Sequence, residues 1–235
     1  MRAVILAGGK GTRLRPYTLV LPKPLVPIGD YPILEVVIRQ LAASGFTHVT
    51  MAVNHLAELV EAFFGDGRRW GLKIDYSVEC RPLSTMAPLK LIRDLPDDFL
   101  VMNGDILTDA PFERLYQEHV AGGNLFTISS YQREVHVDFG VLETDGNGLL
   151  RGFQEKPVQR HDVSMGVYVL SRRVLEHIPD DVPFGFDDLM LALLGKGEKV
   201  HLRGHEGYWL DIGRPDDYVE AVEQFERQKH AFLRQ

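Results

Sequence analysis

A glycine-rich basic segment, AGGKGTRLRP, follows the first apolar run of the sequence. Its glycines allow a ligand to approach the backbone closely, and its lysine and arginines supply positive charge. This combination predicts a cradle for a phosphate chain; a flexible turn with solvated basic residues is the alternative. The Walker and dinucleotide-binding motifs do not fit, because Lys10 precedes a glycine and Leu14 stands where a third glycine belongs. The glycines are Gly8, Gly9 and Gly11, and the basic residues are Lys10, Arg13 and Arg15.

A single lysine, Lys23, lies between Pro22 and Pro24 shortly after this loop. The two prolines favour an extended backbone, so the lysine is presented on a stiff segment. An ammonium group held in this way suits contact with phosphate. An ordinary solvated lysine in a proline-rich loop is the alternative.

The apolar pattern around these segments predicts an α/β fold with a mostly parallel sheet. Short runs typical of strands alternate with segments of 3.6-residue periodicity typical of helices. After residue 124 three strand-like pieces follow, with a Gly-Asn-Gly turn between the last two, which predicts a small antiparallel extension. The predicted strands are 3–6, 49–53, 74–78, 99–102, 125–130, 140–143, 149–154 and 163–170, and the predicted helices are 33–41, 56–64, 86–94 and one from 215 onward.

Composition narrows the classes of partner. The net charge of -7 disfavours nucleic acid or an anionic membrane as the main partner and leaves a small anionic ligand open. The 235 residues fit one domain, 1–235, and show no internal repeat. Cys80 is the single cysteine, which excludes an internal disulfide and fits a reducing compartment. No apolar run suits a signal peptide or a bilayer span, so we expect a cytoplasmic protein.

Several predicted strands end in segments that suit a ligand site. The first strand runs into the glycine loop, another ends at Glu79, and the next ends in Asn103, Gly104 and Asp105. Ligands of open parallel sheets bind beyond the carboxyl ends of the strands, where the loops converge. We therefore expect these segments to share one cleft.

Together these segments resemble the sugar nucleotidylyltransferase family. The family signature begins with a strand, a G-G-x-G-T-R-L-x-P loop and P-K-P-L, and this chain reads GGKGTRLRP and PKPL. The resemblance continues in family order through FFGDGRRWGLKIDYSVE, VMNGDILTD, FQEKP, GVYVL and YWLDIGRPDDY. The chain looks most like the mannose-1-phosphate guanylyltransferase branch, including relatives that activate heptose phosphates. This implies a Rossmann-like three-layer α/β/α sandwich, here expected without the C-terminal left-handed β-helix that such relatives often carry.

The resemblance implies that a sugar 1-phosphate attacks the α-phosphorus of a nucleoside triphosphate and that pyrophosphate leaves. Electrostatic stabilisation should dominate, and Mg²⁺ held by carboxylates is the usual cofactor. Asp105 and Asp211 match the family's metal positions, with capping of the following turn as the alternative role. Arg13 is expected to grip the β- and γ-phosphates, and Lys23 to neutralise phosphate oxygens near the reacting centre.

The FQEKP segment is expected to bind the sugar phosphate by the same resemblance. Glu155 can accept hydrogen bonds from sugar hydroxyls and Lys156 can bind the phosphate, with a surface ion pair as the alternative. Gly140, in DFGVLE, would let the backbone approach the sugar. Ser164 stands where relatives commonly have asparagine, so the contact with a sugar hydroxyl is expected to differ.

Glu79 is expected to select the nucleobase. Its carboxylate can accept N1–H and N2–H of guanine together, whereas uracil and thymine offer one ring N–H flanked by carbonyl oxygens. GTP is therefore the expected donor. The base loop reads PLSTMAP where the family usually reads P-L-G-T-A-G, so a pocket for UTP, dTTP or CTP is the alternative. The expected nucleotide-binding residues are Leu6, Ala7, Gly8, Gly9, Gly11, Thr12, Arg13, Glu79, Ser84, Thr85, Asn103 and Gly104.

A regulatory protein that binds a nucleotide sugar without turnover is a hypothesis of a different class. It would be free to lose the four charged residues Arg13, Lys23, Asp105 and Asp211, and all four are present, which favours an enzyme. A dinucleotide-dependent oxidoreductase is disfavoured because the first loop lacks its fingerprint. A homo-oligomer is compatible with the sequence.

Overall fold

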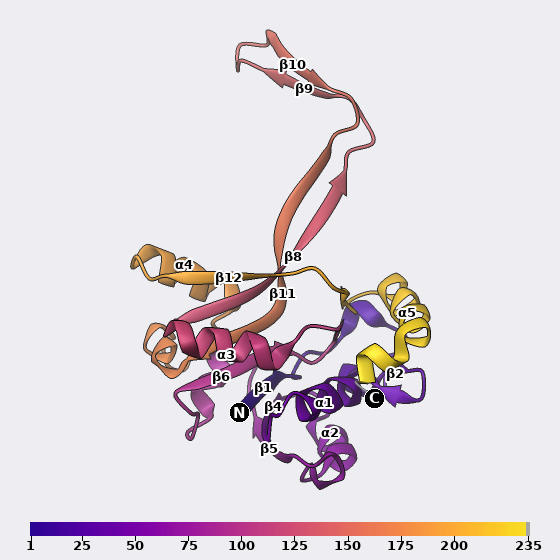
Figure 1. Ribbon diagram of the computed structural model, residues 1–235, viewed down its shortest axis with the longest axis vertical. Helices are drawn as coiled ribbons and strands as arrows, with labels where there is room; N and C mark the ends of the chain where they lie inside the picture. Colours follow the sequence, from indigo (N-terminus) through magenta and orange to yellow (C-terminus); the bar gives the residue numbers. More distant parts are fainter. Residues whose placement is uncertain (234–235) are drawn as a thin grey trace.

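A seven-stranded mixed sheet forms the centre of the computed structural model, which describes residues 1–233 (Figure 1). The strand order is β12-β8-β11-β6-β1-β4-β5. Strand β11 is antiparallel to its neighbours β6 and β8, and the other adjacent pairs are parallel. The predicted mostly parallel, mixed sheet is confirmed. The strands are β1 (Arg2–Leu6), β4 (His48–Val53), β5 (Lys73–Val78), β6 (Asp98–Asn103), β8 (Phe126–His136), β11 (Val158–Ser171) and β12 (Val200–His205).

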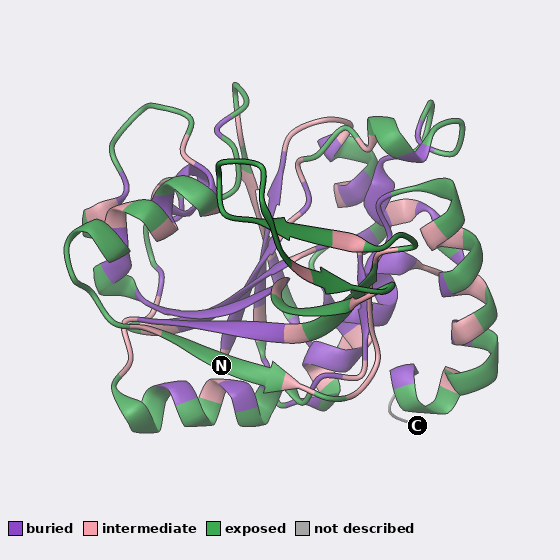
Figure 2. Cartoon of the chain, turned by 90° about the horizontal axis from the view of Figure 1, so that it is seen from above, coloured by how far each residue is buried: buried purple, intermediate pink, exposed green. Residues whose placement is uncertain are grey.

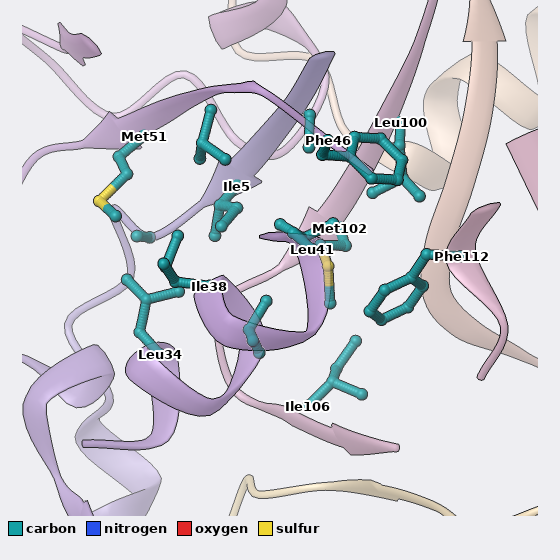
Figure 3. Packing of buried hydrophobic residues seen from close by; sticks show 14 of the residues in the cluster. Ile5, Leu34, Ile38, Leu41, Phe46, Met51, Leu100, Met102, Ile106 and Phe112 are labelled. Carbon is teal, nitrogen blue, oxygen red and sulfur yellow. The ribbon is translucent and has the colours of Figure 1, made fainter. Parts of the chain in front are cut away.

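Helices cover both faces of this sheet, because alternate side chains of a strand point to opposite faces. Ile5 of β1 packs on one face with α1 (Ile33–Ala43), α2 (Ala57–Phe64) and α3 (Phe112–Gly122), and Figure 3 shows part of this core. Val4 packs on the other face with the 3-10 helices η4 (Ala87–Leu91) and η5 (Arg172–His177) and with α4 (Phe186–Gly195). The result is the three-layer arrangement that the resemblance implied.

Helix α1 illustrates how the sequence sets these layers. Leu34, Ile38 and Leu41 recur at helical spacing and are fully buried against the sheet. Burial of each such side chain contributes roughly 1.5–3 kcal/mol relative to exposure. The helix ends at Ala43, Gly45 follows with a φ of +77° that suits glycine, and the Phe46 N–H donates a hydrogen bond to the Leu41 carbonyl at 3.0 Å.

A third apolar cluster fastens the C-terminal helix α5 (Pro215–Leu233) to the body. Phe225 and Phe232 are fully buried, together with Leu14 from the glycine-rich loop. The cluster also holds the short strand β7 (Ile106–Thr108), which pairs antiparallel with β13 (Trp209–Asp211). The remaining short strands are β2 (Pro27–Ile28) and β3 (Tyr31–Pro32). In this way α5 supports two segments that carry predicted site residues.

Strands β8 and β11 continue beyond the sheet as a long two-stranded arm (Figure 1). Residues 131–163 make up this arm, and its tip is the hairpin of β9 (Val141–Thr144) and β10 (Leu150–Gln154). Most of the arm is exposed, and Figure 2 views it from above. The predicted antiparallel extension is confirmed, with β8 and β11 each several residues longer than the sequence pattern indicated.

Other elements differ from the sequence-based prediction. The predicted helix at 86–94 is wrong: the segment forms only η4, and the backbone is already extended at Ile92. Helices α3 and α4 and strands β7, β12 and β13 were not predicted. Within residues 1–233 no helix is both long and apolar enough to cross a membrane.

Candidate active site

A cavity of about 440 Å³ lies at the carboxyl edge of the parallel strands. The segments that follow β1, β4, β5 and β6 all contribute to its wall, as expected for an open parallel sheet. Lys23 and Asp105 line it together with part of the predicted nucleotide-binding set. The members of that set in the wall are Leu6, Ala7, Gly8, Gly9, Glu79, Ser84, Thr85, Asn103 and Gly104, and Lys10, Pro24, Ala52, Asn54, Pro82 and Leu83 complete the lining.

The glycine-rich loop is shaped by Gly11, whose φ is +61°. A Cβ atom there would lie 2.9 Å from Thr18 Cγ2 and 3.1 Å from Lys23 Cβ, so a side chain would displace the lysine segment. The Thr18 hydroxyl donates a hydrogen bond to the Gly11 carbonyl at 2.7 Å. Buried Leu14 anchors the turn that follows. The loop therefore has a fixed form, although Gly11, Thr12 and Arg13 do not line the cavity itself.

Lys23 forms an ion pair with Asp105 across the cavity wall. The lysine is buried in a one-turn 3-10 helix that begins after Pro22, whose backbone is extended. The predicted extended backbone is found at Pro22 but not at Lys23, which begins the 3-10 helix. Oδ1 of Asp105, in contrast, is buried and has no hydrogen-bond partner among the described residues.

Asp211 lies beside Asp105 through the pairing of β13 with β7. Asp211 is opposite Ile106 in this pairing, and the Ile212 N–H donates to the Asp105 carbonyl at 3.0 Å. Burial raises the pKa of Asp211, the negative charge of Asp105 raises it further, and the cations Lys23 and Arg13 oppose the increase. Two carboxylates that repel each other in a partly buried site are well suited to share a cation.

A hard divalent cation fits these residues. Asp105 offers an unsatisfied buried oxygen, and a cation would relieve its repulsion with Asp211. Among residues 1–233 no group of three or more His, Cys, Asp or Glu side chains gathers into a metal cage.

Arg13 approaches the same carboxylates from the glycine-rich loop. A Cβ atom built on Gly213 would lie 3.6 Å from Arg13 Nη2 and 3.5 Å from Asp211 Oδ2, which places both groups around this glycine. Arg13 also has a favourable electrostatic interaction with Asp211. The structure thus brings Arg13, Lys23, Asp105 and Asp211 into one charged cluster.

Glu79 also lines the cavity. Burial raises its pKa, while hydrogen bonds from the Leu83 N–H, at 3.1 Å, and from Asn54 lower it in part. A Cβ atom on Gly8 would lie 3.2 Å from Glu79 Oε1, so the carboxylate adjoins the first loop. Asn54 was not predicted, although its place directly after β4 at the ligand edge was a signal that could have found it.

The altered base loop keeps the backbone form that glycine would favour. Ser84 has a φ of +68°, in the left-handed region. Met86 is fully buried in the core, so it does not narrow the cavity. The loop is fixed to the segment before α4: Phe184 and Leu83 share one backbone hydrogen bond at 3.0 Å, and Thr85 Oγ1 accepts from Phe186 at 2.9 Å.

The predicted sugar-phosphate residues are not brought to the cavity. Gly140, Glu155 and Lys156 lie exposed near the hairpin of the arm. Lys156 has a φ of +44°, unusual for a residue with a side chain. Ser164 lies at the base of the arm and donates a hydrogen bond to the Tyr168 hydroxyl at 3.2 Å, also outside the cavity lining.

The fold and this charged cavity define a nucleotidyl-transferring class of protein, and the chain belongs to the nucleotidyl transferase family, whose model matches residues 2–228. It is 37% identical to a mannose-1-phosphate guanyltransferase of Schizosaccharomyces pombe and 36% identical to one of Gibberella zeae, over 93% and 94% of this chain. It is 34% identical to a UTP–glucose-1-phosphate uridylyltransferase of Synechocystis, over 94% of this chain. The chain spans only 62–63% of the length of these relatives.

Solved structures share the fold. The crystal structure of HddC from Yersinia pseudotuberculosis has a TM-score of 0.75 and 27% identity, and the match covers 95% of this chain and 99% of that one. The same protein complexed with GMP-PN has a TM-score of 0.71. A putative glucose-1-phosphate thymidylyltransferase from Bacillus anthracis also has a TM-score of 0.75, at 24% identity. The predicted fold class is confirmed.

Proposed function

We propose that this protein transfers a guanylyl group from GTP to a sugar 1-phosphate of the mannose type, with release of pyrophosphate. The observation that carries the proposal is the make-up of one cavity wall, which contains both a hydrogen-bond acceptor, Glu79, and the Lys23–Asp105 ion pair. A nucleotide needs this arrangement because its base is read by hydrogen bonds and its phosphates by charge.

The basic residues of the site divide the electrostatic task. The ammonium group of Lys23 would neutralise the α-phosphate oxygens as negative charge develops, and Arg13 would hold the phosphates that leave as pyrophosphate. Backbone N–H groups of Gly8 and Gly9 would approach the phosphate chain closely. Such preorganised charges act without reorganisation during the reaction, which supports in-line transfer between two anions.

Asp105 and Asp211 would hold Mg²⁺ in this proposal. The bound ion would supply Lewis-acid polarisation of phosphate oxygens. In the protein without the ion, Lys23 neutralises one oxygen of Asp105. Lys23 would therefore have two roles. It pairs with the Asp105 carboxylate in the free protein, and it would contact the phosphates of the nucleotide in the complex.

Glu79 would select guanine. One carboxylate can accept two adjacent N–H groups of guanine, and a pyrimidine carbonyl in the same place would be repelled. The two mannose-1-phosphate guanyltransferase relatives support this choice, whereas the Synechocystis uridylyltransferase relative keeps UTP as the main alternative. A cytoplasmic location completes the proposal and is supported by the single cysteine, Cys80.

A pyrophosphate-release assay tests the proposal over a grid of five nucleoside triphosphates and several sugar 1-phosphates. We expect release only with triphosphate, sugar 1-phosphate and Mg²⁺ together, and fastest with GTP. Fastest release with UTP, dTTP or CTP would show that the donor is a pyrimidine nucleotide and not GTP. Binding of a GDP-sugar by calorimetry without turnover under any condition would favour the regulatory alternative.

A further inference from the structure

Two adjacent parallel strands, β4 and β5, end together at the cavity. They pair as far as Val53 opposite Val78. The next residues along the two strands are Asn54 and Glu79, and both line the cavity. The Glu79 N–H donates a hydrogen bond to the Val53 carbonyl at 3.0 Å, so the register continues past the last paired residues. Asn54 and Glu79 are therefore neighbours at the carboxyl edge of the sheet.

Gly8 of the first loop lies against both of these residues. A Cβ atom built on Gly8 would lie 3.3 Å from Asn54 Cβ and 3.2 Å from Glu79 Oε1. Both separations are short for a Cβ atom, so a side chain on Gly8 would have to displace the asparagine or the carboxylate. The three residues thus form one compact group in the cavity wall, in which Glu79 Oε1 faces the first loop.

The carboxylate of Glu79 is held by hydrogen bonds from two different segments. Its Oε2 accepts from the Leu83 N–H of the base loop at 3.1 Å. The Asn54 side chain, at the end of β4, supplies the second hydrogen bond. An ionised carboxylate only accepts hydrogen bonds, so the amide of Asn54 must donate through its nitrogen. Two donors on separate segments restrict the rotation of the carboxylate.

The same hydrogen bonds affect the charge of Glu79. Burial raises the pKa of this carboxyl, and the Leu83 N–H and the Asn54 amide lower it, because each donor stabilises the ionised form. Leu83 donates from the backbone, so Asn54 is the donor that a substitution can remove. The other charged residues of the cavity wall are Lys10, Lys23 and Asp105.

We propose that Asn54 is a positioning residue for recognition of the nucleobase: its amide N–H holds the ionised carboxylate of Glu79 in the orientation that accepts two adjacent N–H groups of guanine. The role of Glu79 in reading the base rests on the proposed function. Asn54 acts through Glu79 and makes no contact of its own with the nucleotide. A contact through both carboxylate oxygens needs them close to the plane of the base, so a carboxylate that rotates freely loses one of the two hydrogen bonds.

An NMR titration of the Glu79 carboxyl tests the hydrogen bond without any assay of activity. In protein isotopically labelled at the glutamate carboxyl carbon, the signal of Glu79 is the one that Glu79→Gln removes. We expect Asn54→Ala to move the titration midpoint of Glu79 to higher pH. A smaller side chain admits water, which alone would lower the pKa, so a rise identifies the lost donor.

Asn147→Ala is the matched control for this titration, because Asn147 lies exposed in the turn between β9 and β10. It should leave the midpoint of Glu79 unchanged. An unchanged or lower midpoint in Asn54→Ala would overturn the proposal.

A double-mutant cycle tests whether Asn54 acts through Glu79. The ratio of kcat/KM for GTP over UTP is measured at neutral pH in the parent, Asn54→Ala, Glu79→Gln and the double variant. We expect Asn54→Ala to lower the ratio roughly threefold or more in the parent and to leave it unchanged in Glu79→Gln. An equal loss in both backgrounds would show that Asn54 contacts the base directly and would overturn the proposal, as would an unchanged ratio in Asn54→Ala.

The proposed function can fail separately from this inference. A parent that turns over no substrate, or that prefers a pyrimidine nucleotide, would contradict the assignment of guanine. The titration midpoint of Glu79 in Asn54→Ala would then still decide whether the asparagine holds the carboxylate.

Discussion

The ammonium group of Lys23 neutralises one oxygen of Asp105, while the other oxygen of the same carboxylate is buried without a hydrogen-bond partner among the described residues. The half-satisfied carboxylate next to Asp211 is therefore the part of the site most sensitive to a change of charge. Asp105→Asn keeps the side-chain volume and removes the charge.

For Asp105→Asn we expect turnover to fall at least about 100-fold, which corresponds to roughly 2.7 kcal/mol of transition-state stabilisation, with the fold retained. Steady-state kinetics across a Mg²⁺ titration, with circular dichroism, provide the measurement. Asp97→Asn, an exposed residue paired with Arg172, is the matched control and should leave turnover unchanged. Near-parental rates in Asp105→Asn would remove this carboxylate from the metal assignment.

The two lysines assigned to phosphates should give different kinetic signatures. Lys23→Ala removes charge at the reacting phosphate and should mainly lower kcat, whereas Lys156→Ala should mainly raise the KM for the sugar phosphate. Both constants are measured with the second substrate saturating. The opposite pattern would show that the roles of the two lysines are exchanged.

Guanine selection by Glu79 should depend on pH. Burial raises the pKa of this carboxyl above the usual value of 4.5, so Glu79 accepts a proton at a higher pH than an exposed glutamate does. Only the ionised carboxylate accepts both guanine N–H groups, so the ratio of kcat/KM for GTP over UTP should fall as pH decreases. At neutral pH we expect at least about tenfold preference, within the roughly 1–3 kcal/mol of a bidentate base contact.

Glu79→Gln is the companion variant for that pH series. An amide does not titrate and offers one acceptor oxygen, so the preference for GTP should be smaller and independent of pH. The prediction does not hold if the variant keeps the parental preference, or if the parent shows no change between neutral and acidic buffer.

Replacement of Ser84 by glycine should stabilise the folded protein. A side chain in the left-handed region costs roughly 1–2 kcal/mol, and the greater freedom of glycine in the unfolded chain returns about half of this. We expect Ser84→Gly to raise the free energy of unfolding by roughly 0.5–1 kcal/mol in urea titration. Ser77→Gly, in the middle of β5, is the comparison and should destabilise by a similar amount. Destabilisation by Ser84→Gly would show that the serine hydroxyl supports the loop.

The sequence predicts the central layers well because their pattern is strong. Side chains of β1 alternate between the two faces of the sheet, and apolar residues of α1 recur at helical spacing. Together these patterns predict a sheet covered by helices. Strand β13 has only three residues, and it forms because it pairs with β7, so its own sequence gives little indication of a strand. The ends of β8 and β11 were underestimated because their outer residues pair with each other in solvent, where no buried face imposes alternation.

The candidate site was predictable to the extent that it lies at strand ends. Glu79 and Asp105 follow strands and were found by that rule, and Asn54 satisfies it too. The left-handed backbone of Ser84 could be suspected only from the glycine that the family usually has at this position, because serine itself rarely adopts this conformation. The distance between Lys156 and the cavity depends on strand length beyond the sheet, which the local pattern does not set.

The reversed direction of β11 has a consequence for how this architecture can diversify. Because β8 leaves the sheet and β11 re-enters it at one edge, the intervening chain both starts and finishes at that edge, and only β11 pairs with β6. Residues can be inserted or deleted there without moving any strand of the core, and the entropic cost of a longer loop grows slowly. Under the proposed function, the segment assigned to the acceptor can therefore diverge in length and sequence while the residues of the cavity stay unchanged.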